Sequence, residues 1–322
     1  MAKLPRHNVR FARFDAATNL FLSRELESVD KQAYEELNAG VLARKYFPTV
    51  NDVDPWDIAY TYKMFKVVGR AIVSSRGASN APAVTLSMTP ATATIKEITD
   101  SYRWTVAEIE RASRKNVPLD RLVAMGAKAI SDRKIDDMLG TGDSDVGITG
   151  ALNIAGVTPA TASTKTSGTA WNATNSATDT DKGKILADVM GMFLAMNTAL
   201  RQTDAPGFQK FVLLVPVSAY TCITMTKSAA ASDMTILKFL LANCPWLEAI
   251  EPWAACDTAG SGGVGRAMLY PRNPMWGGAL VPMDFYSLPP QESGQDIIVP
   301  TRSSCGGVVC RYAVATQYLD GV

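Results

Sequence analysis

Alternating apolar and polar residues in the first third of the chain predict one long β-hairpin. Residues 57–75 (DIAYTYKMFKVVGRAIVSS) are rich in the aromatic and β-branched residues that favour strands. The turn-like stretch RGASNAPA follows, and the chain then returns to about residue 98 as a second strand, in which Val84, Leu86 and Met88 alternate with polar residues. A two-stranded hairpin is marginally stable alone in water, so this one needs cover.

Both faces of the predicted hairpin carry apolar residues. In the first strand Tyr60, Tyr62 and Met64 share one face, whereas Phe65 and Val67 share the other. Long open strand edges also invite pairing with another chain, although the hairpin could instead join a sheet of its own domain. The candidate residues for contact with another copy are Tyr60, Tyr62, Met64, Phe65, Val67, Val84, Leu86 and Met88.

Helical periodicity flanks the hairpin on both sides. Apolar residues recur at spacings of three and four over residues 21–37, before Gly40. After the hairpin, Thr105 and Glu108 have the spacing of a capping box and predict a short helix. A longer helix should begin at Pro118 and end at Gly140.

The second half of the chain alternates helices and strands. Residues 155–181 are rich in threonine and serine and predict a long surface loop. The helix over residues 182–200 should bury one broad face. Its expected members are Ile185, Leu186, Val189, Met190, Phe193, Leu194 and Leu200. Strands and two shorter helices follow, which gives an α+β fold class.

Composition and charge exclude several classes of protein. The chain has 322 residues, 47% of them hydrophobic, and a net charge of +1, so no global basic field points to nucleic acid. The charged N-terminus has no apolar signal region, and no run of about 18 apolar residues predicts a membrane span. Five cysteines form no CxxC pair; we expect small buried thiols, with Cys305 and Cys310 on opposite faces of one strand.

The sequence offers little catalytic chemistry. The single histidine, His7, lies in a basic stretch and makes a poor member of a catalytic triad. Gly260, Gly262 and Gly265 spell GxGxxG, but a strand instead of a helix is expected to follow them, so we expect a loop. No catalytic, cofactor or metal site is predicted, and the chain is not expected to be an enzyme.

Several colinear segments resemble one large group of tailed-bacteriophage major capsid proteins, which have the Hong Kong 97-type capsid fold shared with encapsulins. The similar segments are ARKYFPTVNDVDPW, the passage from DSYRWTVAEIE to GDSDVGITGALN, LLVPVSAYTCI with SDMTILKFLLANCP, and PPQESGQDIIVPTRSSCGGVVCRYAVATQYLDGV. Together they cover about residues 20–322. An encapsulin-type compartment is the alternative.

The resemblance implies a domain plan and a set of partners. Residues 1–54 would form an N-terminal arm and helix, 55–98 an extended loop over a neighbouring subunit, 99–150 with 290–322 a peripheral domain with a long spine helix, and 151–289 an axial domain. The subunit would self-assemble into pentamers and hexamers of an icosahedral head in the virion, built in the host bacterial cytoplasm. The shell would enclose double-stranded DNA bound without sequence preference. Portal, scaffold and decoration proteins are further candidate partners, and no membrane is involved.

The first residues of the arm are basic. Lys3, Arg6, Arg10 and Arg13 precede the first acidic residue, Asp15. Such a stretch can contact phosphates without reading sequence, because each cation that approaches the DNA backbone releases counterions. The alternative is that these cations pair with acidic patches on adjacent subunits.

Overall fold

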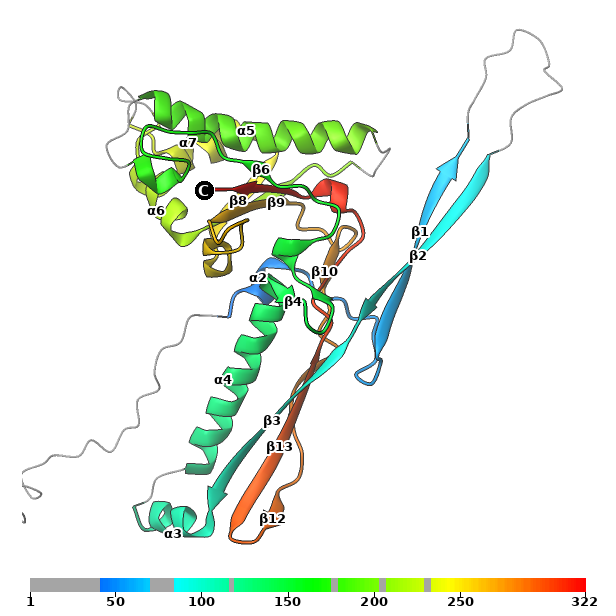
Figure 1. Ribbon diagram of the computed structural model, residues 1–322, viewed down its shortest axis with the longest axis vertical. Helices are drawn as coiled ribbons and strands as arrows, with labels where there is room; N and C mark the ends of the chain where they lie inside the picture. Colours follow the sequence, from blue (N-terminus) through cyan, green and yellow to red (C-terminus); the bar gives the residue numbers. More distant parts are fainter. Residues whose placement is uncertain (1–40, 70–83, 116–118, 175–178, 203–206, 229–232) are drawn as a thin grey trace, which may run out of the picture. The chain divides into compact units, whose positions relative to one another are not determined.

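Two sheets of different topology organise the described part of the chain. The computed structural model describes residues 41–69, 84–115, 119–174, 179–202, 207–228 and 233–322 (Figure 1). The predictions for the basic arm, with Lys3, Arg6, Arg10 and Arg13, and for the helix over residues 21–37 therefore concern residues outside these ranges.

The first sheet has five strands in the order β6-β15-β9-β7-β8. The strands are β6 (Ala160–Thr161), β7 (Phe211–Val215), β8 (Leu247–Pro252), β9 (Arg266–Tyr270) and β15 (Gln317–Asp320). Every residue of β7 and β9 is buried. Continuous burial fits the unbroken apolar run of β7 and that of β9 after Arg266, as in strands covered on both faces.

Three helices pack around this sheet: α5 (Asp179–Gln202), α6 (Val217–Met225) and α7 (Ile236–Asn243). In Figure 1, α5 runs along the sheet, and its contacts include β15. It is the one helix among the described residues that is long and apolar enough to cross a membrane. One stripe of the helix, including Ile185, Val189 and Met196, packs into the core of the subunit.

The orientation of α5 differs from the predicted one. Val189, Met192 and Met196 are buried on the helix, whereas Met190 and Leu194 are 49% and 67% exposed. Nearly every side chain from residue 185 to residue 196 is apolar or small, so the apolar period did not distinguish the two faces. The prediction that Met190 and Leu194 face the core is wrong.

The second sheet is built on the pairing of two ten-residue strands, β3 (Lys96–Thr105) and β13 (Asp296–Cys305), which lie antiparallel along their whole length. β11 (Met283–Ser287) and β12 (Gln291–Ser293) also pair with β13. The long helix α4 (Leu119–Gly140) runs beside this sheet, and a buried contact of 2.9 Å joins Ser131 Oγ on α4 to Ser303 Oγ on β13.

The predicted start of the short helix and the predicted end of the long helix are confirmed, whereas the expected start at Pro118 lies outside the described residues. Helix α3 (Val106–Lys115) opens with the capping box. Thr105 N donates to Glu108 Oε2 at 2.9 Å, and Glu108 N donates to Thr105 Oγ1 at 3.2 Å. Helix α4 ends at Gly140 as expected.

A short helix, α2 (Ala43–Tyr46), joins the two sheets. Ala43 N donates to Asp136 Oδ1 on α4 at 2.7 Å. On the other side, Tyr46 and the following Phe47 pack against Trp253, and Tyr270 on β9 donates its hydroxyl to Tyr46 O at 2.6 Å. Burial, helped by the charge of nearby Glu251, raises the pKa of Tyr46 to about 12.

The short strands complete the connections. They are β4 (Gly142–Asp143) pairing β5 (Ile148–Thr149), and β10 (Gly277–Ala279) pairing β14 (Val308–Cys310). The 3-10 helices are η1 (Ala151–Asn153), η2 (Trp171–Thr174), η3 (Ala254–Asp257) and η4 (Ala313–Ala315). Cys305 ends β13 and Cys310 ends β14, so the expectation that they share one strand is wrong: Gly306 and Gly307, the latter with a φ of +73°, turn the chain between them.

The strand partners refine the expected grouping of residues 99–150 with 290–322. β13 does pair with β3, but the last strand, β15, pairs with β9 and β6 in the other sheet. Conversely, β11 lies inside residues 151–289 yet pairs with β13. The two sheets are therefore interwoven in sequence more closely than simple boundaries at residues 150 and 290 describe.

Candidate functional site

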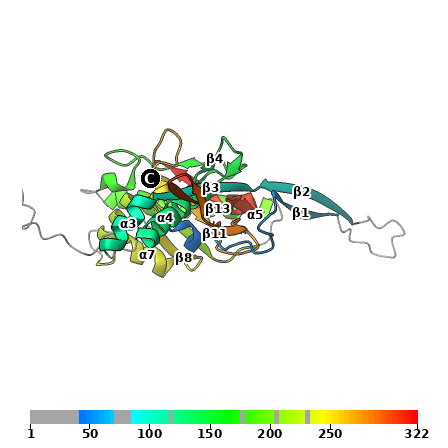
Figure 2. The ribbon, with the colours of Figure 1, turned by 90° about the horizontal axis from the view of Figure 1, so that it is seen from below.

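The predicted hairpin is present as β1 (Ala59–Val68) and β2 (Thr85–Thr94). The strands are antiparallel and in register over their whole length, from Ala59 opposite Thr94 to Val68 opposite Thr85. Within the described residues no third strand joins them. Figures 1 and 2 show the paired strands extending away from both sheets, so most of the hairpin is available to another molecule.

One face of the hairpin is engaged by its own subunit near the base. Tyr60 and Tyr62 stack with ring centroids 6.1 Å apart and pack against a small apolar cluster that includes Leu280. Tyr62 donates its hydroxyl to Cys310 O at 3.1 Å, and Arg311 Nη2 donates to the Tyr60 hydroxyl at the same distance. These two tyrosines, predicted as contacts with another copy, thus hold the hairpin to its own body.

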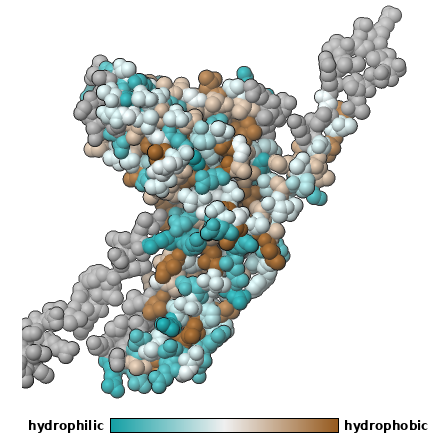
Figure 3. Space-filling view, viewed as in Figure 1, coloured by the Kyte–Doolittle hydropathy of each residue, from teal (hydrophilic) through white to brown (hydrophobic). Residues whose placement is uncertain are grey.

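The opposite face is apolar and exposed. Phe65 lies directly across from Met88, and Leu86 is two residues further along the same face. The exposed fractions are 61% for Phe65, 51% for Met88, 64% for Leu86 and 68% for Val84. Apolar and polar colours mix along the hairpin in Figure 3. Neighbouring large apolar side chains in contact with water are typical of a surface that binds another protein.

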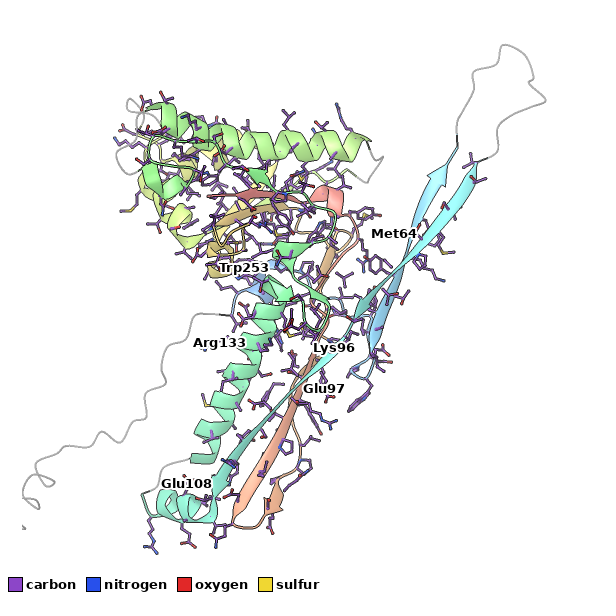
Figure 4. All side chains as sticks on the ribbon, viewed as in Figure 1. Met64, Lys96, Glu97, Glu108, Arg133 and Trp253 are labelled. Carbon is purple, nitrogen blue, oxygen red and sulfur yellow. The ribbon has the colours of Figure 1, made fainter. Side chains whose placement is uncertain are left out.

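The remaining predicted contact residues are placed less completely. Met64 is half-buried on β1 (Figure 4). Val67 lies in β1 opposite Leu86, but its side chain is not among those that the structure describes. The candidate DNA-contacting residues Lys3, Arg6, Arg10 and Arg13 lie outside the described ranges.

A second surface, which sequence reasoning missed, lies at the base of the hairpin. A pocket of about 230 Å³, here called the foot pocket, has Trp56 and Ile58 at its edge, 74% and 81% exposed. Its lining comprises Pro55, Trp56, Asp57, Ile58, Ile95, Lys96, Glu97, Met283 and Ser304. Figure 4 shows Lys96 and Glu97 where β2 passes into β3. Trp56 among polar residues was the available signal, since an isolated tryptophan in a loop is often a contact residue.

The threonine-rich segment, which was predicted as a surface loop, also contributes buried side chains. Trp171 is wholly buried, and the Lys165 side chain is 0% exposed. Lys165 Nζ donates to Asp188 Oδ2 on α5 at 3.1 Å and to the carbonyl oxygens of Ser163 and Thr169, both at 2.8 Å. Trp171 Nε1 donates to the same carboxylate oxygen at 3.1 Å. This buried ion pair fastens the segment to α5 and serves structure, because every donor of Lys165 is occupied.

A second buried ion pair ties the last strand to its neighbour. Arg266 on β9 donates through Nε to Asp320 Oδ1 at 2.6 Å and through Nη2 to Asp320 Oδ2 at 2.9 Å. Burial acts to raise the pKa of Asp320, but hydrogen bonds from Arg266 and from Ser261 N outweigh it and hold this pKa below its ordinary value. The bidentate pair keeps both residues charged and joins β15 to β9 inside the sheet.

The described residues do not assemble a catalytic or metal-binding constellation. They contain no group of three or more histidine, cysteine, aspartate or glutamate side chains that could hold a metal ion. Burial raises the pKa of Cys305 to about 11 and that of Cys310 to about 12, which keeps both thiols protonated and unreactive at neutral pH. The glycine turn at residues 260–265 leads into the strand β9, as expected, so it offers no helix N-terminus to a phosphate.

The described residues thus present an exposed apolar face on the hairpin and bring no metal-binding group of side chains together. The model of the family described as "Major capsid protein" matches residues 69–322. The chain belongs to the major capsid protein family. No curated protein matches this capsid protein in sequence. Its family and fold make it a structural protein of a phage virion, a subunit of an icosahedral head shell, and favour this function over the encapsulin-type alternative.

Solved structures give the fold of the capsid protein. The capsid of Myoviridae phage XM1 matches with a TM-score of 0.76 and 18% identity, over 93% of this chain and 98% of that one. The capsid of an empty GTA particle matches at 0.60 and 10%, over 96% and 99% of the two chains. A structure from Mycobacterium phage Bobi matches at 0.56 and 14%, again over 96% and 99%. The capsid protein therefore has the Hong Kong 97-type fold that the sequence resemblance implied.

Proposed function

We propose that this capsid protein assembles into five- and six-subunit rings that close into a head around double-stranded DNA. The exposed apolar face of the hairpin carries the proposal. Phe65, Leu86 and Met88 project from a hairpin that is held to its own subunit by its other face, and the described residues of that subunit leave all three more than half exposed. Burial of such side chains contributes about 1.5–3 kcal/mol each, enough for a few of them to drive association.

The proposal extends to the enclosed genome and to the site of assembly. The basic arm, with Lys3, Arg6, Arg10 and Arg13, would face inward and bind phosphates without sequence preference, since these cations precede any acidic residue. Assembly would take place in the cytoplasm of the bacterial host. A portal protein, together with a scaffold or decoration protein, would be the further partners of the shell.

Electron microscopy of the purified protein tests this function. After nuclease treatment and size-exclusion chromatography, we expect closed icosahedral particles, or tubes and sheets built from five- and six-membered rings. Replacement of Lys3, Arg6, Arg10 and Arg13 by alanine should leave particle assembly intact in this experiment. In a separate assay, phage complemented with the variant should package less DNA than phage complemented with the wild-type protein.

Two results would count against the proposal. A small oligomer that stays discrete at high concentration, with a scaffold protein from the same phage supplied, would contradict ring and shell assembly. If the arm variant fails to form particles, the DNA-binding role of the arm is contradicted. The four cations would then act in contacts between subunits.

A further inference from the structure

Helix α5 exposes apolar side chains on the side turned away from the core. Met190 and Leu194 lie about one helical turn apart and are 49% and 67% exposed. Between them is Gly191, where an added Cβ atom would meet nothing within 4 Å. In Figure 1, α5 lies along the outside of the five-stranded sheet. Another molecule can therefore approach this apolar face closely.

An aromatic cavity of about 370 Å³ adjoins this face. Phe193 of α5 and Trp246, which precedes β8, form part of its wall and stack with ring centroids 4.1 Å apart. Both side chains are only half-buried, so the cavity opens to the surface. Its described lining has no charged residue, and its volume is in the range of pockets that enclose a ligand. We call the cavity, together with Met190 and Leu194, the α5 groove.

Positive charge lies at both ends of the groove. Lys184, near the start of α5, is 38% exposed. Arg201, two turns beyond Leu194 on the same side of the helix, is exposed and forms no ion pair with a described residue. The one acidic residue between positions 182 and 201 is Asp188, which is buried against Lys165. A partner that covers this length of α5 therefore gains from negative charge.

We propose that the α5 groove binds an acidic amphipathic helix of a second protein. A bulky apolar residue of that helix would enter the cavity beside Trp246, and its apolar stripe would cover Met190 and Leu194. Its carboxylates would lie near Lys184 and Arg201. Helices that bind in grooves present anchors at spacings of three, four and seven residues, which the row of side chains along α5 can match. The site is separate from the hairpin, so it does not depend on ring assembly.

The charges of α5 argue against a second copy of the same helix as the partner. Because Lys184 and Arg201 stand at opposite ends of the groove, both a parallel and an antiparallel pair of α5 helices would set cation against cation. Like charges across an interface disfavour a partner. A helix with glutamates on both sides of its apolar stripe meets both cations instead.

Peptide binding to the unassembled full-length chain tests the proposal. The probe is a fluorescein-labelled peptide of about 18 residues, with leucines at spacings of three and four and with glutamate and alanine elsewhere. The control peptide carries lysine in place of each glutamate. In fluorescence anisotropy, the glutamate peptide should bind at least about tenfold more tightly than the lysine peptide, because its charge complements that of the groove.

Substitutions locate the binding. Leu194→Asp should weaken binding of the glutamate peptide at least about tenfold, since it puts a carboxylate in the apolar centre of the contact. The matched control is Ile130→Asp at a residue that is 62% exposed on α4, which should bind like the wild type. Arg201→Glu should narrow the difference between the two peptides, whereas Arg133→Glu, at another exposed residue of α4, should not. Thermal unfolding checks that each variant folds.

Three results would overturn the proposal. The first is a glutamate peptide that binds no more tightly than the lysine peptide, and the second is an equal loss of binding in Leu194→Asp and Ile130→Asp. The third is a folded Leu194→Asp chain that no longer forms particles by itself, since a second copy would then cover the groove. A wild-type chain that never forms particles would contradict the shell function alone, because peptide binding is measured on the unassembled chain.

Discussion

At the scale of single residues, buried charges fix the positions of segments whose composition predicts a loop. Lys165 is enclosed between two carbonyl oxygens and Asp188, and Trp171 donates to the same carboxylate. The free-energy cost of desolvating such a pair is large, so one buried charge is strongly destabilising when its partner is removed. One buried pair thereby orders a threonine-rich segment that has almost no regular secondary structure.

Replacement of Lys165 by methionine should leave Asp188 charged and without its cation in the core. We expect the free energy of unfolding to fall by about 3–5 kcal/mol. The matched control is Lys227→Met, since Lys227 is 55% exposed and pairs at 3.1 Å with Asp233, which is fully exposed. That change should lower the free energy of unfolding by less than about 1 kcal/mol. Urea denaturation of unassembled subunits measures both, and equal effects would contradict the structural role of the buried pair.

At the scale of elements, the sequence predicts the type of an element better than the face that it buries. The capping box of α3, the end of α4 at Gly140 and the hairpin were all predictable, because each depends on local residue chemistry. The buried face of α5 was not predictable, because apolar or small side chains occupy nearly every position around that helix. The foot pocket was missed for another reason: it forms only when the loop at Trp56 meets residues near 283 and 304, which are far away in sequence.

Paired substitutions on α5 check which face it buries. Met196→Ala should lower the free energy of unfolding by about 2–5 kcal/mol, because Met196 is wholly buried and its truncation leaves a cavity. Leu194→Ala, at a position 67% exposed, should change it by no more than about 0.5 kcal/mol. If Leu194→Ala lowered the stability more than Met196→Ala in thermal or urea unfolding, the buried face would be the one that the sequence predicted.

At the scale of the whole molecule, the short helix α2 determines how the two sheets are joined. It hydrogen-bonds to Asp136 on one side and packs into the aromatic cluster around Trp253 on the other. Burial raises the pKa of Asp136, and the hydrogen bond from Ala43 N only partly opposes this. The folded state therefore binds the Asp136 proton more tightly than the unfolded state does.

The raised pKa of Asp136 makes the stability of the fold depend on pH in a defined direction. Because the folded pKa is the higher one, the contribution of Asp136 to stability falls as pH rises from its unfolded value, about 3.9, through the raised folded value. Asp136→Asn removes the charge and keeps an oxygen that can accept from Ala43 N. The variant should unfold at a higher urea concentration than the wild type at pH 7, and the difference should shrink toward pH 4. A difference that grows on acidification would contradict the buried-charge account.

The place of β15 in its sheet has a consequence for the order of events during synthesis. β15 (Gln317–Asp320) lies between β6 and β9, away from the edge of the sheet, although it is the last strand of the chain. The five-stranded sheet cannot be completed until residue 320 has left the ribosome, and the β3–β13 pair likewise waits for residues translated almost two hundred positions later. Both sheets therefore depend on pairings between strands that are far apart along the chain. Until β15 pairs, the edges of β6 and β9 stay open, and open strand edges on an incomplete sheet favour aggregation of the newly made chain.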